Sequence, residues 1–190
     1  MKQNEFKNKL IDNYKLTESD WEITKHFFKV EYYEPKEYFC KKGAIANKLG
    51  KVNNGIFRSF YYDDQGRDIS LQFFEKGTVV ILPDSFNNST PAEENIIACT
   101  KAEIITITQD EMQQLYDKIP VWQQICKDVA DIKNKKLLDR TIQFQTLTAT
   151  ERYHNFCNQH PEIIAQVALT HIASYLGIDI ATLSRIRKKK

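Results

Sequence analysis

The sequence predicts an α+β chain: an N-terminal helix and a jelly-roll β-barrel, then a long helix, then a helical C-terminal domain. Three observations support this fold class. Five of the six glycines lie between residues 33 and 108, where they separate short runs rich in aromatic and β-branched residues. A helical pattern without Gly or Pro follows Pro120. The last twenty residues contain two short apolar-patterned segments hinged at Gly177.

The first 30 residues are predicted to be helical, because Thr17 followed by Asp20 is a helix start signal. Within the barrel region, "GIFRSFYYDDQGRDISLQFF" indicates a β-hairpin whose turn lies at residues 63–66. The segment "ENIIACTKAEIITIT" indicates two more strands around a turn at Thr100 and Lys101. Short strands at this spacing are typical of a barrel or jelly roll.

Residues 119–147 are predicted to form one long helix between the two domains. Its apolar stripe comprises Trp122, Ile125, Val129, Ile132 and Leu137. We expect this stripe to be the seam of a homodimer; the alternative is that the helix packs on the barrel. Thr148, followed by Glu151 three residues later, is a capping box that starts the next helix.

The C-terminal pattern predicts a helix-turn-helix. Ile172, Ala173 and Leu176 repeat at helical intervals before Gly177, and Leu183 with Ile186 does so after it. Gly177 can adopt a positive φ, and Asp179 can cap the second helix, over 180–189, which would enter the DNA major groove. The residues expected to face DNA are Ile180, Ala181, Ser184, Arg185, Lys188 and Lys189. The alternative is an ordinary helical hairpin with a solvated basic tail.

The charge distribution agrees with DNA contacts at this end. The net charge is +2, yet residues 148–190 carry six Lys or Arg against three Asp or Glu, a balance of +3. Five of the six cations fall in the last six residues. We expect Arg185 to read a base edge, and Lys188 and Lys189 to hold phosphates, which supply affinity without sequence information.

Four stretches carry a likeness to a known family: Glu151-Arg152-Tyr153, His160-Pro161-Glu162, residues 172–178 and residues 182–189. With the hairpin above, they resemble the Crp/Fnr transcription regulators. The resemblance implies a cyclic nucleotide-binding-like sensory domain at 1–118, a dimerisation helix at 119–147 and a DNA-binding domain at 148–190. It implies double-stranded DNA with an inverted-repeat operator, a second copy of the chain and RNA polymerase as partners. Family members often add a β-hairpin wing, which we expect this chain to lack, since it stops at Lys190.

The resemblance also locates the effector site and gives grounds to doubt its usual ligand. Nucleotide-binding members carry a Gly-Glu pair and an Arg that pairs with the cyclic phosphate. Here the pair falls on Ile81-Leu82, and the Arg position falls on Ala92, followed by Glu93 and Glu94. An anionic phosphate would meet two carboxylates and no guanidinium. We therefore expect no cyclic AMP binding; the effector, if there is one, is unidentified.

Composition excludes other classes. The four histidines, at 26, 154, 160 and 171, lie outside the barrel, so the metal site of a cupin enzyme is not expected, nor is any cofactor. The four cysteines are scattered, and no nucleophile motif occurs. No apolar run approaches the length of a membrane span, and we expect a cytoplasmic protein. The rival function is a ligand-sensing module that signals through protein contacts without DNA.

Overall fold

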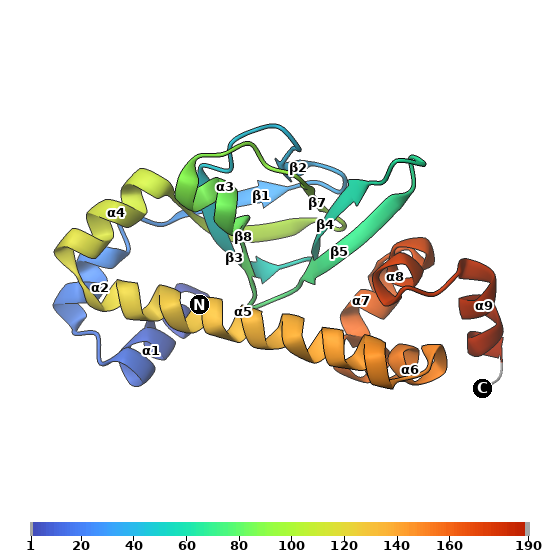
Figure 1. Ribbon diagram of the computed structural model, residues 1–190. Helices are drawn as coiled ribbons and strands as arrows, with labels where there is room; N and C mark the ends of the chain where they lie inside the picture. Colours follow the sequence, from blue (N-terminus) through green and yellow to red (C-terminus); the bar gives the residue numbers. More distant parts are fainter. Residues whose placement is uncertain (1, 189–190) are drawn as a thin grey trace.

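Two antiparallel four-stranded sheets form the barrel at the centre of the molecule (Figure 1). The computed structural model describes residues 2–188. One sheet has the order β1-β8-β3-β6 and the other the order β2-β7-β4-β5. The strands are β1 (Lys29–Tyr33), β2 (Tyr38–Cys40), β3 (Lys48–Asn54), β4 (Phe57–Tyr62), β5 (Asp68–Phe74), β6 (Val79–Val80), β7 (Asn95–Ala98) and β8 (Ala102–Thr108).

The predicted hairpin is confirmed as β4 and β5. Gly66 in its turn has a φ of +74°, and the Asp63 carboxylate accepts backbone N–H groups from Gln65 and Arg67. The hairpin contains a β-bulge: Ser59 pairs with Gln72 and Phe60 with Ser70, so Leu71 has no partner across β4. Both strands predicted in 94–108 are also present, but β7 and β8 belong to different sheets. The turn between them therefore carries the chain from one sheet to the other.

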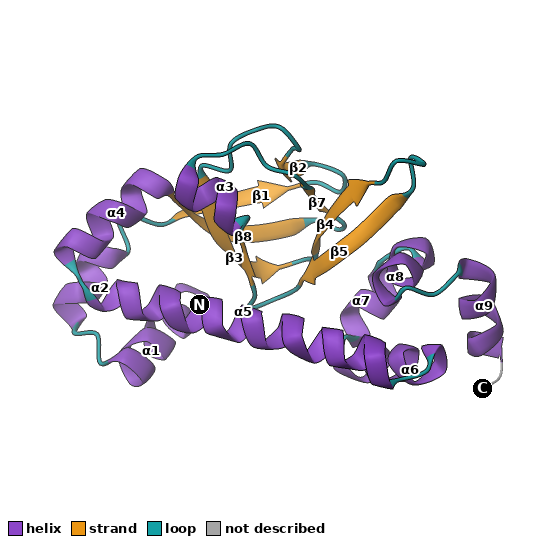
Figure 2. Cartoon of the chain, in the orientation of Figure 1, coloured by secondary structure: helices purple, strands orange, loops and turns teal. Residues whose placement is uncertain are grey.

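Helices lie at both ends of the barrel, and one long helix runs along it between them (Figure 2). They are α1 (Lys2–Tyr14), α2 (Glu18–Thr24), α3 (Pro83–Asn88), α4 (Gln109–Lys118), α5 (Val121–Thr146), α6 (Ala149–Gln159), α7 (Pro161–Gln166), α8 (Leu169–Leu176) and α9 (Ile180–Lys188). The α+β class and the jelly-roll barrel are thus confirmed. In the described part of the chain no strand follows α9, and none of its helices is both long and apolar enough to cross a membrane.

Local sequence signals set several helix starts. Thr17, Thr108 and Thr148 each cap a helix with the side-chain oxygen, while the Asp or Glu three residues later bonds back to the cap. The capping box at Thr148 confirms the predicted start of α6. Only Leu147 and Thr148 separate α5 from α6, so the long helix leads almost directly into the C-terminal domain.

The first half of α5 packs inside its own chain, against α1, α2 and α4. Trp122 and Ile125 are buried there, and the Trp122 indole donates to the Thr24 hydroxyl over 3.2 Å. The prediction that these two residues form a dimer seam is therefore wrong. Further along, Ile132 and Leu137 are exposed, as are Leu138, Ile142 and Phe144. Periodicity alone could not separate the two halves, since both are apolar at helical spacing.

The C-terminal helices share a core with the barrel. Their buried residues include Tyr153, Phe156, Ile172, Leu176 and Leu183, and the same cluster contains Ile56 and Phe73 of the hairpin region. Helix α8 lies along β5, and Figure 1 shows α9 at the far end of the molecule, beyond α8. Helix α9 is therefore separated from the barrel by α8, which itself packs on β5.

Candidate DNA-binding and ligand-binding sites

The turn between α8 and α9 has the geometry that the sequence predicts. Gly177 adopts a φ of +61°, and its neighbour Ile178 is buried and donates its N–H to the carbonyl of Ala173 over 2.9 Å. The Asp179 carboxylate accepts the N–H of Ala181 over 2.7 Å. This bond is the main cause of the lowered pKa of Asp179. The turn holds the axis of α9 at a fixed angle to α8.

The outer face of α9, opposite Leu183, is exposed to solvent. Leu183 is buried and Ile186 packs partly beside it, so the opposite face points to solvent. On that face Ile180, Ala181, Arg185 and Lys188 are exposed, and Ser184 is partly exposed. Lys189, the remaining predicted contact, lies outside the described residues.

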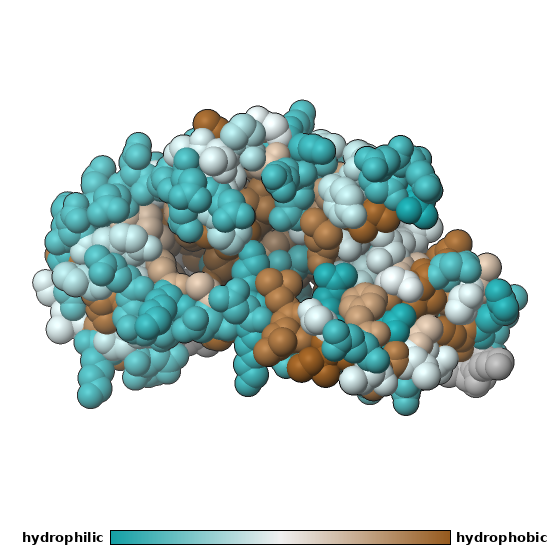
Figure 3. Space-filling model, in the orientation of Figure 1, coloured by the Kyte–Doolittle hydropathy of each residue, from teal (hydrophilic) through white to brown (hydrophobic). Residues whose placement is uncertain are grey.

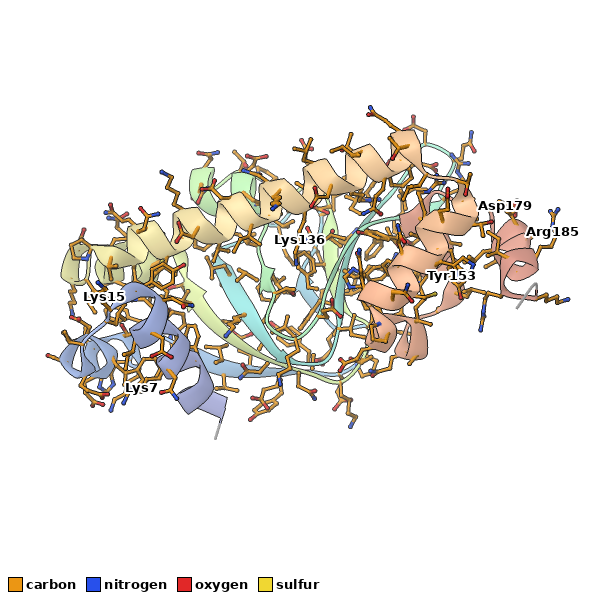
Figure 4. The ribbon with its side chains drawn as sticks, turned by 90° about the horizontal axis from the view of Figure 1, so that it is seen from below. Lys7, Lys15, Lys136, Tyr153, Asp179 and Arg185 are labelled. Carbon is orange, nitrogen blue, oxygen red and sulfur yellow. The ribbon has the colours of Figure 1, made fainter. Side chains whose placement is uncertain are left out.

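The basic residues of α9 divide into two groups. The Arg187 guanidinium faces Tyr153 of α6. The Arg185 side chain, by contrast, extends away from the body of the molecule, whereas Tyr153 is labelled nearer its middle (Figure 4). Its Nε donates to the carbonyl of Ala181 over 3.4 Å, which leaves the end of the guanidinium available. Of the two arginines of α9, Arg185 is therefore the one whose guanidinium is free to contact a partner molecule.

The predicted ligand residues lie on the segment from β6 to β7, but most of them serve the core. Ile81 packs against the helical cluster around Trp122. Leu82 and Ala92 belong to the barrel core, with exposed fractions of 6% and 4%. Glu93 is exposed. A cavity of about 290 Å³ is lined by residues 38–41 and 44–48, and none of these five residues lines it, although Ala92 donates its N–H to the carbonyl of the lining residue Ala44 over 2.8 Å.

Glu94 is the exception, because it is partly buried. The Ser59 hydroxyl hydrogen-bonds to its carboxylate, while the Oε2 atom is shielded from solvent without a partner. Burial raises the pKa of Glu94, and the positive charge of Lys133 on α5 acts in the opposite direction. Lys133 donates from Nζ to the carbonyl of Ile81 over 3.4 Å.

The sequence argument missed Lys133. Its position four residues after Val129 gives no signal by itself, because the apolar stripe of α5 could face either the chain or solvent. Burial lowers the pKa of Lys133, and the nearby carboxylates of Glu94 and Asp84 act against that shift. A phosphate placed here would therefore meet one ammonium as well as two carboxylates, and still no guanidinium. Elsewhere in residues 2–188, no group of three His, Cys, Asp or Glu side chains could hold a metal ion.

Comparison with known proteins matches this architecture. Residues 30–118 match the family model of the cyclic nucleotide-binding domain. FixK2 from Bradyrhizobium japonicum superposes with a TM-score of 0.72 at 16% identity, over 85% of this chain and 83% of that chain. A putative Crp/Fnr-family regulator from Eubacterium rectale gives a TM-score of 0.70 at 13% identity, over 95% and 85%. The chain has the Crp/Fnr fold.

A third structure extends the Crp/Fnr likeness over nine-tenths of both chains. CLP of Xanthomonas campestris, described as a c-di-GMP responsive global regulator, has a TM-score of 0.67 at 19% identity, with 91% of each chain covered. The comparison of the sequence with curated proteins gave no match. The resemblance stated from the sequence is thus confirmed at the level of the fold, from the barrel to the C-terminal helices.

Proposed function

We propose that this protein is a DNA-binding transcription regulator of Crp/Fnr type. The observation that carries the proposal is α9: a basic, solvent-facing helix follows a glycine turn and a capped start, on a chain with the Crp/Fnr fold. Arg185 can bond both O6 and N7 of a guanine, and Lys188 can hold a phosphate. Since its partner is DNA, we place the protein in the cytoplasm, with RNA polymerase as the further partner that such a regulator implies.

The regulator would act as a homodimer through the second half of α5. Figure 3 shows apolar side chains gathered over this part of the helix. The exposed residues Leu138 and Ile142 are one turn apart on one face. In a two-fold dimer, two copies of α9 would enter successive major grooves about 34 Å apart, so the operator would be an inverted repeat.

The sensory domain, we propose, does not bind cyclic nucleotides in the manner of that domain family. Ala92 replaces the expected arginine, and it is buried in the barrel core. The cation whose charge acts on Glu94 is Lys133, a point charge that cannot form the two parallel hydrogen bonds of a guanidinium. An effector bound on this segment would have to suit Glu94, whose Oε2 atom accepts no hydrogen bond from the residues that the structure describes.

The test compares two substitutions on α9. Arg185→Ala should weaken binding by about 1–3 kcal/mol at the cognate site and relax the preference at one base pair. Lys188→Ala should weaken cognate and scrambled DNA alike and lower the salt slope by about one unit. Lys42→Ala, which removes an exposed lysine from the barrel, is the control and should change neither.

The operator would first be selected from genomic fragments bound by the full chain, and the affinities measured by mobility shift across a salt series. If the parental protein binds no DNA, the rival module without DNA binding takes its place. If Arg185→Ala and Lys188→Ala affect cognate and scrambled DNA equally, the roles assigned to the two side chains are wrong.

A further inference from the structure

We infer that Arg140 couples the DNA-binding domain to the sensory domain and so sets the orientation of the recognition helix. The inference builds on the proposed function, because it concerns how α9 is presented to DNA. Arg140 is on α5, two turns beyond Lys133, and its guanidinium joins three elements that are far apart in the sequence: α5, β5 and α8.

The contacts use both ends of the guanidinium fork. Nη1 donates to the carbonyl oxygen of Leu71 on β5 over 2.7 Å, and Nη2 donates to that of Tyr175 on α8 over 2.9 Å. The guanidinium also stacks on the Tyr175 ring, 4.2 Å from its centroid. A planar group with fixed donor directions can hold two carbonyls in one relative position, which a lysine cannot do.

Leu71 lies where the backbone of β5 is open to other elements. Strand β5 is the edge of its sheet, so among the described strands only β4 lies beside it. Ser70 and Gln72 pair with β4, whereas Leu71 is the extra residue of the β-bulge. The Leu71 carbonyl accepts its hydrogen bond from Arg140 on the long helix instead.

Burying the charged guanidinium of Arg140 costs free energy, which its hydrogen bonds to Leu71 and Tyr175 offset. Arg140 is partly buried, and its Nε is shielded from solvent without a hydrogen-bond partner. Burial also lowers the pKa of the Arg140 guanidinium. A merely solvated surface arginine would carry neither penalty. The side chain is therefore held at the junction by its bonds to Leu71 and Tyr175.

Contacts around Arg140 connect it with the turn at Gly177 that precedes α9. Ser174 accepts the N–H of Ser70 over 2.9 Å and donates to the carbonyl of Asp68 over 3.1 Å, so α8 is fixed along β5. Tyr175, which accepts from Arg140, comes two residues before Gly177. On the other side, the centre of the Phe144 ring lies 5.3 Å from the Arg140 guanidinium, and its Cε1 atom lies 2.7 Å from where a Cβ on Gly177 would be.

Loss of the guanidinium should therefore loosen α8 against β5, where the Ser174 bonds remain, before it disturbs either domain. DNA would then bind only the fraction of molecules in which α9 is correctly placed, and the apparent affinity would fall by that fraction. Arg140→Gln removes the charge and both bonds, while Arg140→Lys keeps the charge and at most one bond. Lys136→Gln, one turn earlier on α5 and exposed, is the matched control (Figure 4).

Amide hydrogen exchange measures the coupling without DNA. In Arg140→Gln, amides of residues 68–74 and 169–176 should exchange about ten- to hundred-fold faster. This range corresponds to the stability that hydrogen bonds to a charged group contribute against local opening. Amides of β8, in the barrel core, should keep their rate. Arg140→Lys should fall between Arg140→Gln and the parental protein, and Lys136→Gln should match the parental protein.

The outcomes separate the coupling from the proposed function. Unchanged exchange at residues 169–176, or equal acceleration in β8, would overturn the coupling. If Arg140→Gln does not fold, the same two criteria apply to Arg140→Lys. With the coupling present, Arg140→Gln should also weaken operator binding about ten-fold or more, and parental affinity would refute the effect on α9. If no variant, the parental chain included, binds DNA while exchange accelerates as expected, the coupling stands and the proposed function falls.

Discussion

Replacing Leu138 and Ile142 together by Gln tests where the homodimer is held. Gln has nearly the helix propensity of Leu, so α5 should persist, and the change acts on the apolar face alone. The two side chains are one turn apart, and the solvent-exposed fractions of their residues are 60% and 46% in the single chain. Neither residue belongs to a buried cluster of its own chain, which makes the fold insensitive to the exchange.

The size of the effect follows from these exposed fractions. Complete burial of a Leu or Ile side chain is worth about 1.5–3 kcal/mol. About half of each residue remains to be buried, which gives about 1 kcal/mol per side chain. A two-fold interface uses each residue twice, so four side chains contribute about 4 kcal/mol. At 1.4 kcal/mol per factor of ten, the dimer should dissociate about a thousand-fold more readily.

Sedimentation equilibrium over a wide range of protein concentration gives the two dissociation constants. The control is a pair of exposed apolar residues on the barrel, Ile45→Gln with Tyr62→Gln, with exposed fractions of 52% and 55%. This pair should leave the dimer intact. A Leu138/Ile142 variant that remains as dimeric as the parental chain, or a parental chain that is monomeric throughout, would refute the reasoning.

Three further predictions concern the ligand, the domain junction and the turn. Cyclic AMP and cyclic GMP should show no micromolar binding by calorimetry, and binding that depends on the cyclic phosphate would contradict the ligand argument. Burial, and secondarily the charge of Arg58, lower the pKa of His171, so the unfolded chain takes up the proton first and stability should fall as pH drops below about 6.5. Urea unfolding at pH 7.5 and 5.5 should show a smaller loss in His171→Gln, but not in the exposed control His154→Gln; equal losses would refute this. Gly177→Ala should lower the free energy of unfolding by about 1–2 kcal/mol for the positive φ, and further because the new Cβ would lie 2.7 Å from the Phe144 ring. Gly66→Ala, where a Cβ would meet no atom within 4 Å, should show only the loss due to the positive φ.

Features that depend on neighbours in the sequence could be predicted without the structure. The capping box at Thr148 and the turn at Gly177 each need a few adjacent residues, and both are present as expected. The hairpin of β4 and β5 is also local. Its short turn brings the strands together, although the bulge at Leu71 leaves no mark in the sequence.

Features that depend on distant pairing could not be predicted. The apolar pattern of α5 does not say that Trp122 faces the N-terminal helices while Leu138 faces solvent, because both choices satisfy a period of 3.6. Lys133 and Arg140 were overlooked for a related reason. Their partners lie in the loop after β6, on β5 and on α8, more than thirty residues away, and a lone cation on a helix otherwise suggests a solvated face. The DNA-facing residues of α9 and the dimer face remain predictions.

The central place of β8 has a consequence for how the protein is made. Strand β1 pairs only with β8, with Lys29 opposite Thr106, and β8 also pairs with β3. A ribosome adds about 5–20 residues each second, so the growing chain carries β1 without its partner for about 4–15 s. During that interval Val30 and Tyr32 belong to a bare strand that any nearby extended segment could pair with. The duration is set by the length of chain between the two strands, and faster translation of this stretch is the simplest way to shorten it.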